Sequence, residues 1–198
     1  MRKIPSLFKR DYEGTRLVYD DIVPGSEWVL TGEGIATIKW DGTACMVRAG
    51  ILYRRHDRKL NKKTQGHKPA PDGWEPCEEE PNEHTGHWPG WVPIGDGPED
   101  KWHRQAWKAV AGDLLDGTYE LVGPKVQGNP YGLDNHELWR HGSWEARLAA
   151  RDFEGLRSWF ADRRPDVEGI VWHHPDGRMV KIKRKDFGLA WPPEGVEA

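Results

Sequence analysis

Apolar and polar residues alternate in short runs along much of the chain, which is the pattern of half-buried β-strands. Two pairs of these runs are separated by strong turn residues, Ala49-Gly50 and Pro175-Asp176-Gly177, and they therefore predict antiparallel hairpins. The predicted strands are residues 26–30, 34–39, 43–48, 51–54, 118–122, 167–173 and 178–183.

Two longer segments carry apolar residues at helical spacing instead. Residues 101–115 form the first predicted helix, which ends before Gly117, and residues 143–160 form the second, with Ser143 as its N-cap. The chain shows neither the βαβ rhythm of a parallel sheet nor the glycine-rich loop of a P-loop enzyme. The predicted fold class is therefore α+β, with antiparallel β-sheets flanked by helices.

A long segment between these elements, residues 61–100, is rich in proline, glycine and acidic residues. Connections of this length are uncommon unless they are functional or disordered. Four apolar side chains predict that part of it packs against the fold: Trp74, Trp88, Trp91 and Val92. The segment also holds Cys77, His84 and His87, with His67 nearby, but their spacing matches no paired zinc motif, so a zinc site is the less favoured interpretation.

The composition is that of a polar globular protein. Of the 198 residues 36% are hydrophobic and 31% charged, while 12 tryptophans supply core material. The length suits one domain or at most two small ones, and we expect a single domain over residues 1–198. No apolar run approaches the ~20 residues of a membrane span, and the first ten residues lack the apolar region of a signal peptide. Two cysteines do not make a disulfide scaffold, so we expect a reducing, cytoplasmic location and no association with a membrane.

The charge is distributed unevenly, although the net charge is only −3. Residues 72–100 are acidic and contain neither lysine nor arginine. One basic cluster consists of Arg54, Arg55, Arg58, Lys59, Lys62 and Lys63, and a second of Arg178, Lys181, Lys183, Arg184 and Lys185. Such clusters are typical either of a nucleic-acid-binding stripe or of solvated faces, and the sequence alone leaves both interpretations open.

Five short elements follow one another in a fixed order. They are Lys39-Trp40-Asp41-Gly42, Leu52-Tyr53-Arg54-Arg55, Tyr119-Glu120-Leu121-Val122-Gly123, Glu168-Gly169-Ile170-Val171 and Lys181-Ile182-Lys183. In this order they resemble the motifs of the covalent nucleotidyltransferases, the superfamily of polynucleotide ligases and mRNA capping enzymes. Residues 85–93, 127–132 and 183–188 resemble stand-alone ATP-dependent 5′-3′ RNA ligases in particular. The resemblance spans nearly the whole chain, which makes it far more specific than a K-x-D-G tetrapeptide alone.

The resemblance implies a nucleotidyltransferase (adenylation) domain and assigns roles to named residues. It implies that Lys39 carries AMP covalently and that Glu120 accepts hydrogen bonds from the ribose hydroxyls. It implies that Glu168 binds the divalent metal, Mg²⁺ or Mn²⁺, since Mg²⁺ uses one or two carboxylates together with waters and phosphate oxygens. The nucleotide-binding residues that it implies are Ile38, Arg55, Glu120, Lys181 and Lys183.

Arg54 and Arg55 are neighbours on a predicted strand, so their side chains should point to opposite faces. We prefer Arg55 as the arginine that contacts the AMP ribose or the RNA 3′ end. The predicted RNA-binding residues are Arg54, Lys59, Lys62 and Lys63, because contacts with phosphates are made largely by lysine and arginine.

The chemistry of lysyl-AMP formation explains why lysines should gather around Lys39. A free lysine has a pKa of about 10.4, so only about one in a thousand is neutral near neutral pH. Neighbouring positive charge and burial both lower a lysine pKa. Lys181 and Lys183 alternate with Ile182 on a strand and should share one face, although two lysines on an exposed edge strand would give the same pattern.

The resemblance thus implies an ATP-dependent RNA ligase that joins 5′-phosphate and 3′-hydroxyl RNA ends through a lysyl-AMP intermediate. ATP and Mg²⁺ or Mn²⁺ are the implied cofactors, and we expect no obligate protein partner. A DNA ligase or a capping guanylyltransferase is the first alternative, but both usually carry an OB-fold after the last lysine motif. Only residues 186–198 follow it here, so we expect no OB-fold domain. A non-catalytic RNA-binding module is the second alternative.

Overall fold

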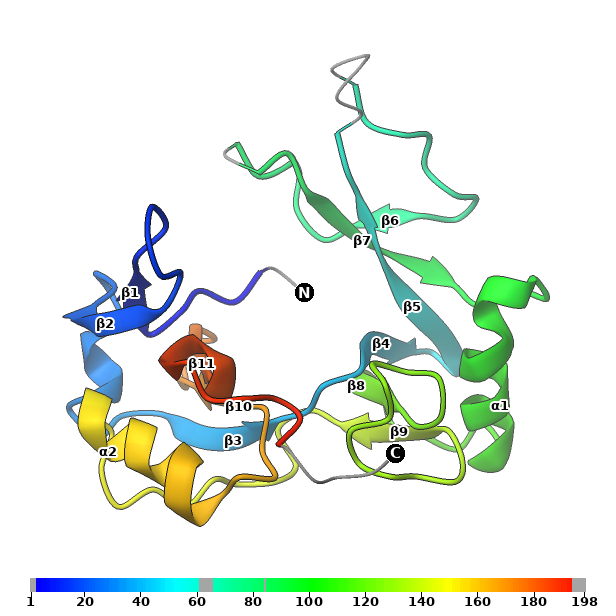
Figure 1. Ribbon diagram of the computed structural model, residues 1–198. Helices are drawn as coiled ribbons and strands as arrows, with labels where there is room; N and C mark the ends of the chain where they lie inside the picture. The colour runs from blue at the N-terminus through cyan, green and yellow to red at the C-terminus, as the bar shows by residue number, and fades with distance from the viewer. Residues whose placement is uncertain (1–2, 61–65, 84, 194–198) are drawn as a thin grey trace. The chain divides into compact units, whose positions relative to one another are not determined.

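The computed structural model describes residues 3–60, 66–83 and 85–193. The chain forms two compact units: the central unit contains residues 42–140, and the terminal unit contains residues 4–41 and 141–193. Figure 1 shows the strands and helices of both. Each unit is described by itself below.

A three-stranded antiparallel sheet organises the terminal unit, in the order β11-β10-β3. Its strands are β3 (Ile35–Lys39), β10 (Gly169–His173) and β11 (Met179–Lys183). One face of the sheet is apolar and buried, because Ile38, Ile170 and Ile182 lie opposite one another across the three strands and are at most 4% exposed. The alternation that predicted these strands thus places every second residue in the core.

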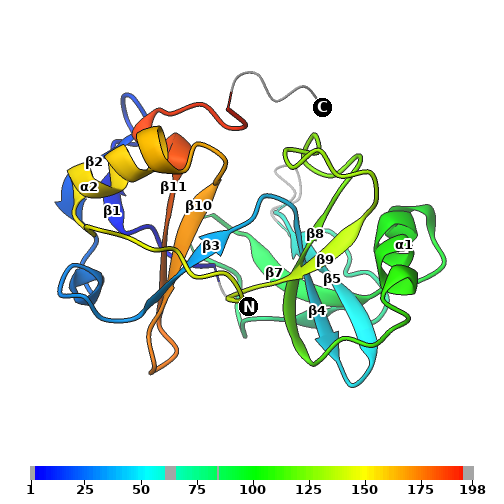
Figure 2. The same ribbon diagram turned by 90° about the horizontal axis from the view of Figure 1, so that it is seen from below.

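One α-helix with a π-helical continuation belongs to the terminal unit. It is α2 (Phe153–Ser158), followed by η3 (Trp159–Arg163). Figure 2 shows α2 alongside the sheet of its unit. The helix contributes Leu156 and its continuation Phe160 to the core, and both side chains are fully buried.

The predicted helix over residues 143–160 is wrong in its first half. Residues 144–146 pair with the free edge of β3 instead: the Ile38 amide donates to the Trp144 carbonyl over 2.7 Å, and the Ala146 amide to the Ala36 carbonyl over 2.8 Å. Hydrogen bonds to an open strand edge outweigh the helical spacing of this segment, since propensity is a weak preference. The N-cap is therefore Asp152, whose carboxylate accepts from the Gly155 amide, and not Ser143.

The N-terminal segment closes the other edge of this sheet. The Leu7 amide donates to the Lys181 carbonyl over 2.8 Å, and the Lys181 amide donates to the Pro5 carbonyl over 2.9 Å. The chain then forms a small two-stranded sheet of β1 (Phe8–Arg10) and β2 (Val18–Ile22), which the sequence pattern did not predict. A strand predicted over residues 26–30 is wrong, because this segment forms the 3₁₀ turn η1 (Glu27–Val29).

The central unit is built on a six-stranded antiparallel sheet in the order β6-β7-β5-β4-β8-β9. Its strands are β4 (Thr43–Arg48), β5 (Ile51–Arg58), β6 (Glu75–Pro76), β7 (Trp88–Pro93), β8 (Gly117–Val122) and β9 (Glu137–Arg140). The 3₁₀ turn η2 (Pro98–Asp100) leads into α1 (Lys101–Ala109), which packs on one face through the buried Ala106. The sheet side chains in this core are Cys45, Val47, Leu52, Tyr119, Leu121 and Leu138.

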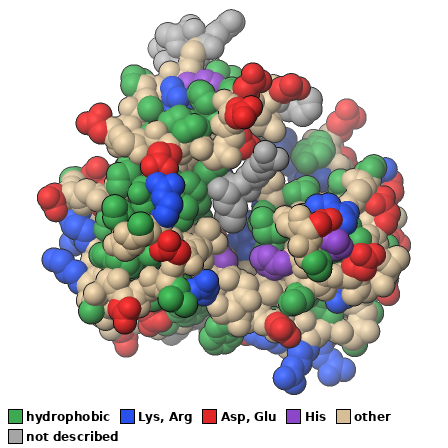
Figure 3. Space-filling model, turned by 180° about the vertical axis from the view of Figure 1, so that it is seen from behind, with side chains coloured by type: hydrophobic (Ala, Val, Ile, Leu, Met, Phe, Trp, Pro, Cys, Tyr) green, Lys and Arg blue, Asp and Glu red, His purple; other side chains and the backbone are tan. Residues whose placement is uncertain are grey.

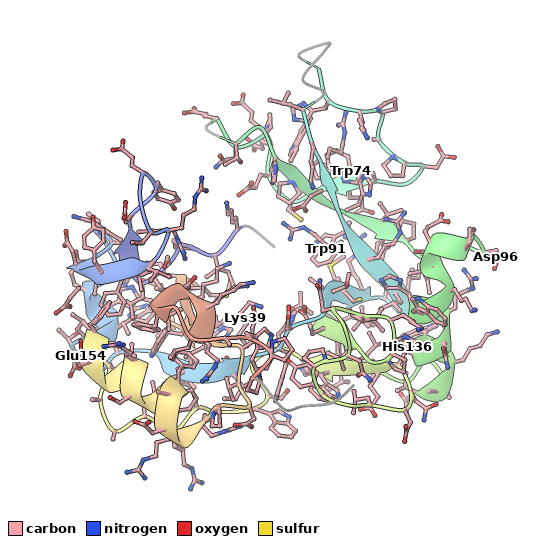
Figure 4. The ribbon with its side chains drawn as sticks, viewed as in Figure 1. Lys39, Trp74, Trp91, Asp96, His136 and Glu154 are labelled. Carbon is pink, nitrogen blue, oxygen red and sulfur yellow. The ribbon has the colours of Figure 1, made fainter. Side chains whose placement is uncertain are left out.

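Part of the long segment, residues 61–100, packs against the fold as predicted, and it does so through β7. Trp91 and Val92 are each 5% exposed, and Figure 4 shows Trp91 and Trp74 at this part of the sheet. The rings of Trp74 and Trp88 meet edge to face at 5.2 Å, and the Arg58 guanidinium lies over both of them. Two aromatic rings of the segment thus pack together with one arginine of β5.

The predicted antiparallel sheets flanked by helices are confirmed, and both predicted hairpins form. The first predicted helix is shorter than expected, since it ends at Ala109 and the positive φ of Ala111 and Gly112 turns the chain. The adenylation fold, the single domain over residues 1–198 and the absence of an OB-fold stay predictions. Among the described residues, neither helix has the length and apolar character needed to cross a membrane.

Candidate active site

A row of residues across the sheet of the terminal unit carries the predicted nucleophile. Gly169 of β10 lies directly opposite Lys39 on one side and Lys183 on the other, so the two lysines share one face and flank a glycine. Lys181, two residues before Lys183, shares this face. Figure 4 shows Lys39 at the end of β3. The predicted clustering of the three lysines is therefore confirmed.

A buried carboxylate joins the two outer lysines of this row. Lys39 Nζ lies 2.6 Å from Glu168 Oε2, and Lys183 Nζ lies 2.5 Å from Glu168 Oε1. Glu168 is 1% exposed, whereas the lysine side chains remain 22% and 23% exposed. A buried carboxylate needs such partners because its desolvation is costly. Both of its oxygens bind an ammonium group, and the amino group of Lys39 also donates to the Trp40 carbonyl over 3.0 Å.

The glycine in the middle of the row is required by space. A Cβ at Gly169 would lie 2.7 Å from the Ile182 carbonyl oxygen and 3.4 Å from the Lys39 Cβ. Any side chain here would meet the backbone of β11 and enter the space between the two lysines. Glu168 of the motif thus supplies a buried hydrogen-bond acceptor, and Gly169 leaves space for the two long lysine side chains.

Lys181 lies in surroundings that disfavour its charge. Burial lowers its pKa from 10.5 to about 8, with further contributions from the positive charges of Lys183 and Lys39. Lys39 and Lys181 are therefore close enough to influence each other electrostatically. The predicted lowering of the Lys39 pKa by its neighbours stays a prediction.

Ile38, a predicted nucleotide-binding residue, points to the opposite face. Its side chain is 4% exposed and packs in the apolar core of the sheet. Its amide is engaged with the Trp144 carbonyl. The side chain therefore faces away from the three lysines, and its predicted role stays a prediction.

Trp191 and Trp144 contact the two residues that follow Lys39, and the sequence pattern did not identify either contact. The Trp191 indole donates to Asp41 Oδ2 over 2.9 Å, which ties the C-terminal segment to the K-x-D-G tetrapeptide. Trp40 is 7% exposed and meets the ring of Trp144 edge to face at 5.2 Å. Trp40 is thus a packing residue of the terminal unit.

The last residue of the tetrapeptide, Gly42, belongs to the central unit and contacts Glu120 there. Its amide donates to Glu120 Oε1 over 3.0 Å. A Cβ at Gly42 would lie 2.2 Å from the Leu121 carbonyl oxygen and 2.8 Å from the Glu120 Cγ. Glycine is therefore the residue that lets the chain approach β8 closely enough for this hydrogen bond.

Arg55 and Glu120 lie on the same face of the central sheet, the face opposite α1. Glu120 alternates with the core residues Tyr119 and Leu121, and it is 8% exposed. Arg55 Nε lies 2.6 Å from Asp57 Oδ1, and its guanidinium lies over the Trp91 ring at 5.7 Å.

Arg54 points to the α1 face, as the alternation predicted. Its Nε lies 2.7 Å from Asp100 Oδ1, and Asp100 is buried at the start of α1. This ion pair serves packing in the central unit, whereas RNA binding by Arg54 stays a prediction.

The remaining basic residues do not all lie on open surface. Lys59 is exposed, whereas Lys62 and Lys63 lie outside the described residues. In the second basic cluster, Arg184 is 8% exposed and donates to the Ala190 carbonyl over 2.7 Å. On the face shown in Figure 3, lysine and arginine side chains form separate small groups among acidic ones. RNA binding by these lysines stays a prediction.

Glu168 fits the role of a metal ligand in its chemistry. One carboxylate is sufficient for Mg²⁺ when phosphate oxygens and waters complete the coordination. Within residues 3–60, 66–83 and 85–193, no three histidine, cysteine or acidic side chains lie together as a metal-binding group. Of the residues considered for zinc, His84 lies outside the described part, and the His67 ring is 2.7 Å from the Gly86 carbonyl oxygen.

Comparison with known proteins identifies similar sequences. A family model described as RNA ligase 1 matches residues 106–197, which include Glu120, Glu168, Lys181 and Lys183. RNA ligase 1 of Mus musculus is 30% identical over 269 aligned residues, which cover 96% of this chain and 81% of the mouse protein. RNA ligase 1 of Rattus norvegicus is 29% identical over 269 residues, covering 96% and 82% of the two chains. RNA ligase 1 of Danio rerio is 37% identical over 143 residues, covering 57% and 44%.

Proposed function

Since this chain belongs to the RNA ligase 1 family, we propose that it is an ATP-dependent RNA ligase that joins 5′-phosphate and 3′-hydroxyl RNA ends through AMP carried on Lys39. The observation that carries the proposal is the row of Lys39, Gly169 and Lys183 across one sheet, with the buried Glu168 bound to both lysines. A polyphosphate requires positive charge, and this face supplies it through Lys39, Lys183 and the neighbouring Lys181.

Lys39 acts as the nucleophile in the first step. Its amino group loses a proton and attacks the α-phosphorus of ATP; a nitrogen–phosphorus bond forms and pyrophosphate leaves. The adenylyl group then passes to an oxygen of the RNA 5′-phosphate: an oxygen–phosphorus bond forms, the nitrogen–phosphorus bond breaks, and the free lysine is restored. The RNA 3′-hydroxyl finally attacks the activated 5′-phosphate, a phosphodiester forms and AMP leaves.

Lys181 and Lys183 assist in two ways. Their positive charge favours the neutral form of Lys39, and the same charge stabilises the negative charge that develops on the transferring phosphoryl group. The ion pair between Lys39 and Glu168 acts in the opposite direction, because a neighbouring carboxylate favours the ammonium form. Lys39 becomes reactive when its contact with Glu168 is released.

Glu168 is the residue that would hold the divalent cation, and a bound cation would supply charge neutralisation at the phosphates. Both oxygens of Glu168 contact ammonium groups here, so binding a cation requires that at least one of these contacts be exchanged.

Glu120 and Arg55 are assigned to the nucleotide by their motif positions. Glu120 already accepts one hydrogen bond, from the Gly42 amide, through one carboxylate oxygen. A carboxylate has two oxygens and about four acceptor sites, which makes it a suitable acceptor for the two ribose hydroxyls. Gly42 is separated from Lys39 in the sequence by Trp40 and Asp41 alone, which makes the tetrapeptide the link between the nucleophile and Glu120.

The proposal is tested by incubating the protein with α-labelled ATP and resolving it under denaturing conditions. We expect label on the wild-type chain and none on Lys39→Arg, which keeps the positive charge beside Glu168 but cannot act as a nucleophile, since arginine stays protonated. Lys185→Ala, which removes an exposed lysine near the same motif, is the matched control and should label normally. Label on Lys39→Arg at the wild-type level would refute the assignment.

The reaction with nucleic acid separates the alternatives. Labelled enzyme should release AMP when RNA with a 5′-phosphate is added, and joined RNA should appear when a 3′-hydroxyl end is also present. A protein that accepts GTP in preference to ATP would be a capping-type enzyme, and one that joins DNA but not RNA would be a DNA ligase. A chain that binds RNA but never becomes labelled would be a non-catalytic RNA-binding module.

A further inference from the structure

The N-terminal segment of the chain contacts the turn that follows β11 through a charged side chain that none of the motifs contains. We propose that Arg10 is a positioning residue of the ligase site, which holds Asp186 and through it the backbone of Lys183; this inference rests on the proposed function. Arg10 lies on β1, 176 residues before Asp186 in the sequence.

A continuous series of contacts leads from Arg10 to the nucleophile. The Arg10 guanidinium pairs with Asp186 Oδ1, and Asp186 Oδ2 accepts a hydrogen bond from the Lys183 amide over 2.9 Å. The Lys183 amino group binds Glu168, and the other oxygen of Glu168 binds Lys39. All five residues belong to the terminal unit.

Asp186 is the critical member of this series because its position is buried. It is 6% exposed and lies in the 3₁₀ turn η4 (Arg184–Phe187), which begins where β11 ends. A buried carboxylate without a counter-charge is costly, so removing Arg10 leaves Asp186 to find other partners. The Lys183 amide is one of its present partners, and any movement of Asp186 therefore acts directly on the end of β11.

The rest of the N-terminal segment is anchored without Arg10. Leu7 and Phe8 are at most 1% exposed, and the Phe8 ring meets the Phe153 ring edge to face at 5.1 Å. The Leu7 amide also donates to the Lys181 carbonyl. Truncating Arg10 therefore leaves the segment attached to the sheet. It removes one hydrogen bond within the segment, to the Arg16 carbonyl, and the counter-charge of Asp186 at the end of β11.

A displaced Lys183 has a specific effect on catalysis. The lysine contributes charge to the transferring phosphoryl group, and it occupies the oxygen of Glu168 that Lys39 does not use. Small misplacements of catalytic groups reduce rates strongly, by up to about a hundredfold for about 1 Å. For a group held indirectly through Asp186, we expect about a tenfold loss in the rate constant of lysyl-AMP formation.

The experiment measures the single-turnover rate constant and the amplitude of AMP labelling in the full chain, at saturating ATP. Arg10→Ala is compared with Lys9→Ala, a matched control that removes the neighbouring cation of β1. Lys9 pairs with Asp21 over 2.7 Å, and both side chains are well exposed. Arg10→Lys, which keeps the charge, is the third variant.

We expect the rate constant of Arg10→Ala to fall about tenfold while the amplitude, corrected for folded protein, stays at the wild-type level. Lys9→Ala should match the wild type, and Arg10→Lys should recover part of the rate. A defect of folding alone would lower the uncorrected amplitude and leave the rate constant unchanged. That result would overturn the inference, as would a rate constant equal to that of Lys9→Ala. If Arg10→Ala yields too little folded protein, a normal rate constant in the folded fraction that remains would overturn it too. Failure of the wild type itself to label would instead refute the proposed function, and the inference with it.

Discussion

Replacing Lys181 with methionine tests whether the positive charge of this residue on β11 lowers the stability of the folded protein. Lys181 is largely buried beside Lys39 and Lys183, and burial and these charges lower its pKa from 10.5 to about 8. Methionine keeps the length of the apolar stem and removes the charge. We therefore expect Lys181→Met to be more stable than the wild type near neutral pH, and slower in forming lysyl-AMP.

The size of the stability gain follows from the pKa. A difference between 10.5 and about 8 corresponds to about 3 kcal/mol, at about 1.36 kcal/mol for each pH unit. Because the pKa is lower in the folded state, the unfolded state binds more protons between pH 8 and pH 10.5, and wild-type stability rises with pH in this window. The cost is complete below pH 8 and disappears above pH 10.5. The advantage of Lys181→Met should thus shrink from about 3 kcal/mol at about pH 7 to about 1 kcal/mol at about pH 9.5.

Urea denaturation of both proteins at about pH 7 and about pH 9.5 measures this change. Lys185→Met is the control, because Lys185 is exposed and its replacement should change the free energy of unfolding by less than about 0.5 kcal/mol at either pH. The reasoning is refuted if Lys181→Met is no more stable than the wild type at neutral pH. It is equally refuted if the gain does not decrease as the pH rises.

Two further substitutions probe the tetrapeptide that follows the nucleophile. Gly42→Ala should lower the free energy of unfolding by about 1–3 kcal/mol and slow AMP labelling, because its Cβ would meet the Leu121 carbonyl oxygen. Gly50→Ala is the control, since Gly50 has a positive φ of 73° and no atom lies within 4 Å of its Cβ. It should lower stability by about 1 kcal/mol in thermal denaturation and leave labelling unchanged. Trp191→Phe should keep the packing but remove the hydrogen bond to Asp41, and we expect a several-fold slower labelling rate with little change in melting temperature; a normal rate would show that the C-terminal segment does not act on the tetrapeptide.

The strands of the terminal unit could be predicted because their alternation is set by one buried face. Ile38, Ile170 and Ile182 enter the core, so the residues beside them must point the other way. The same rule places Lys181 and Lys183 on a common face from the sequence alone. Local periodicity is sufficient to predict the facing of side chains wherever one face of a strand is buried.

The second helix could not be predicted because a long-range contact decides its start. Residues 144–146 have the composition of a helix, yet they satisfy the edge of β3, which is more than 100 residues earlier in the sequence. The 3₁₀ turn at residues 27–29 is a similar case, since its apolar residues pack into the core without strand pairing. Neither outcome has a signal within the segment itself.

The contacts within the candidate site could not be predicted from the sequence for the same reason. Glu168 could be assigned to a metal by its motif, but its bonds to Lys39, 129 residues away, and to Lys183 depend on the pairing of three strands. Arg10 lies outside every motif and is linked to the site through Asp186. The motifs name the residues to which the proposed function assigns the chemistry, and the structure adds the residues that contact them.

The balance of charge on the lysine face explains why Lys181 is retained despite its cost. Three amino groups lie on this face, and Glu168 pairs with two of them, so the unliganded protein carries an excess of positive charge in a partly buried place. Under the proposed function, the phosphates of ATP and of the RNA 5′ end bring the opposite charge, and the same lysines then gain interactions rather than losing solvation. Such an arrangement lowers the stability of the free enzyme and favours the state in which the phosphoryl group is transferred. Stability and activity should therefore change in opposite directions when Lys181 is replaced, which a residue kept for packing alone would not show.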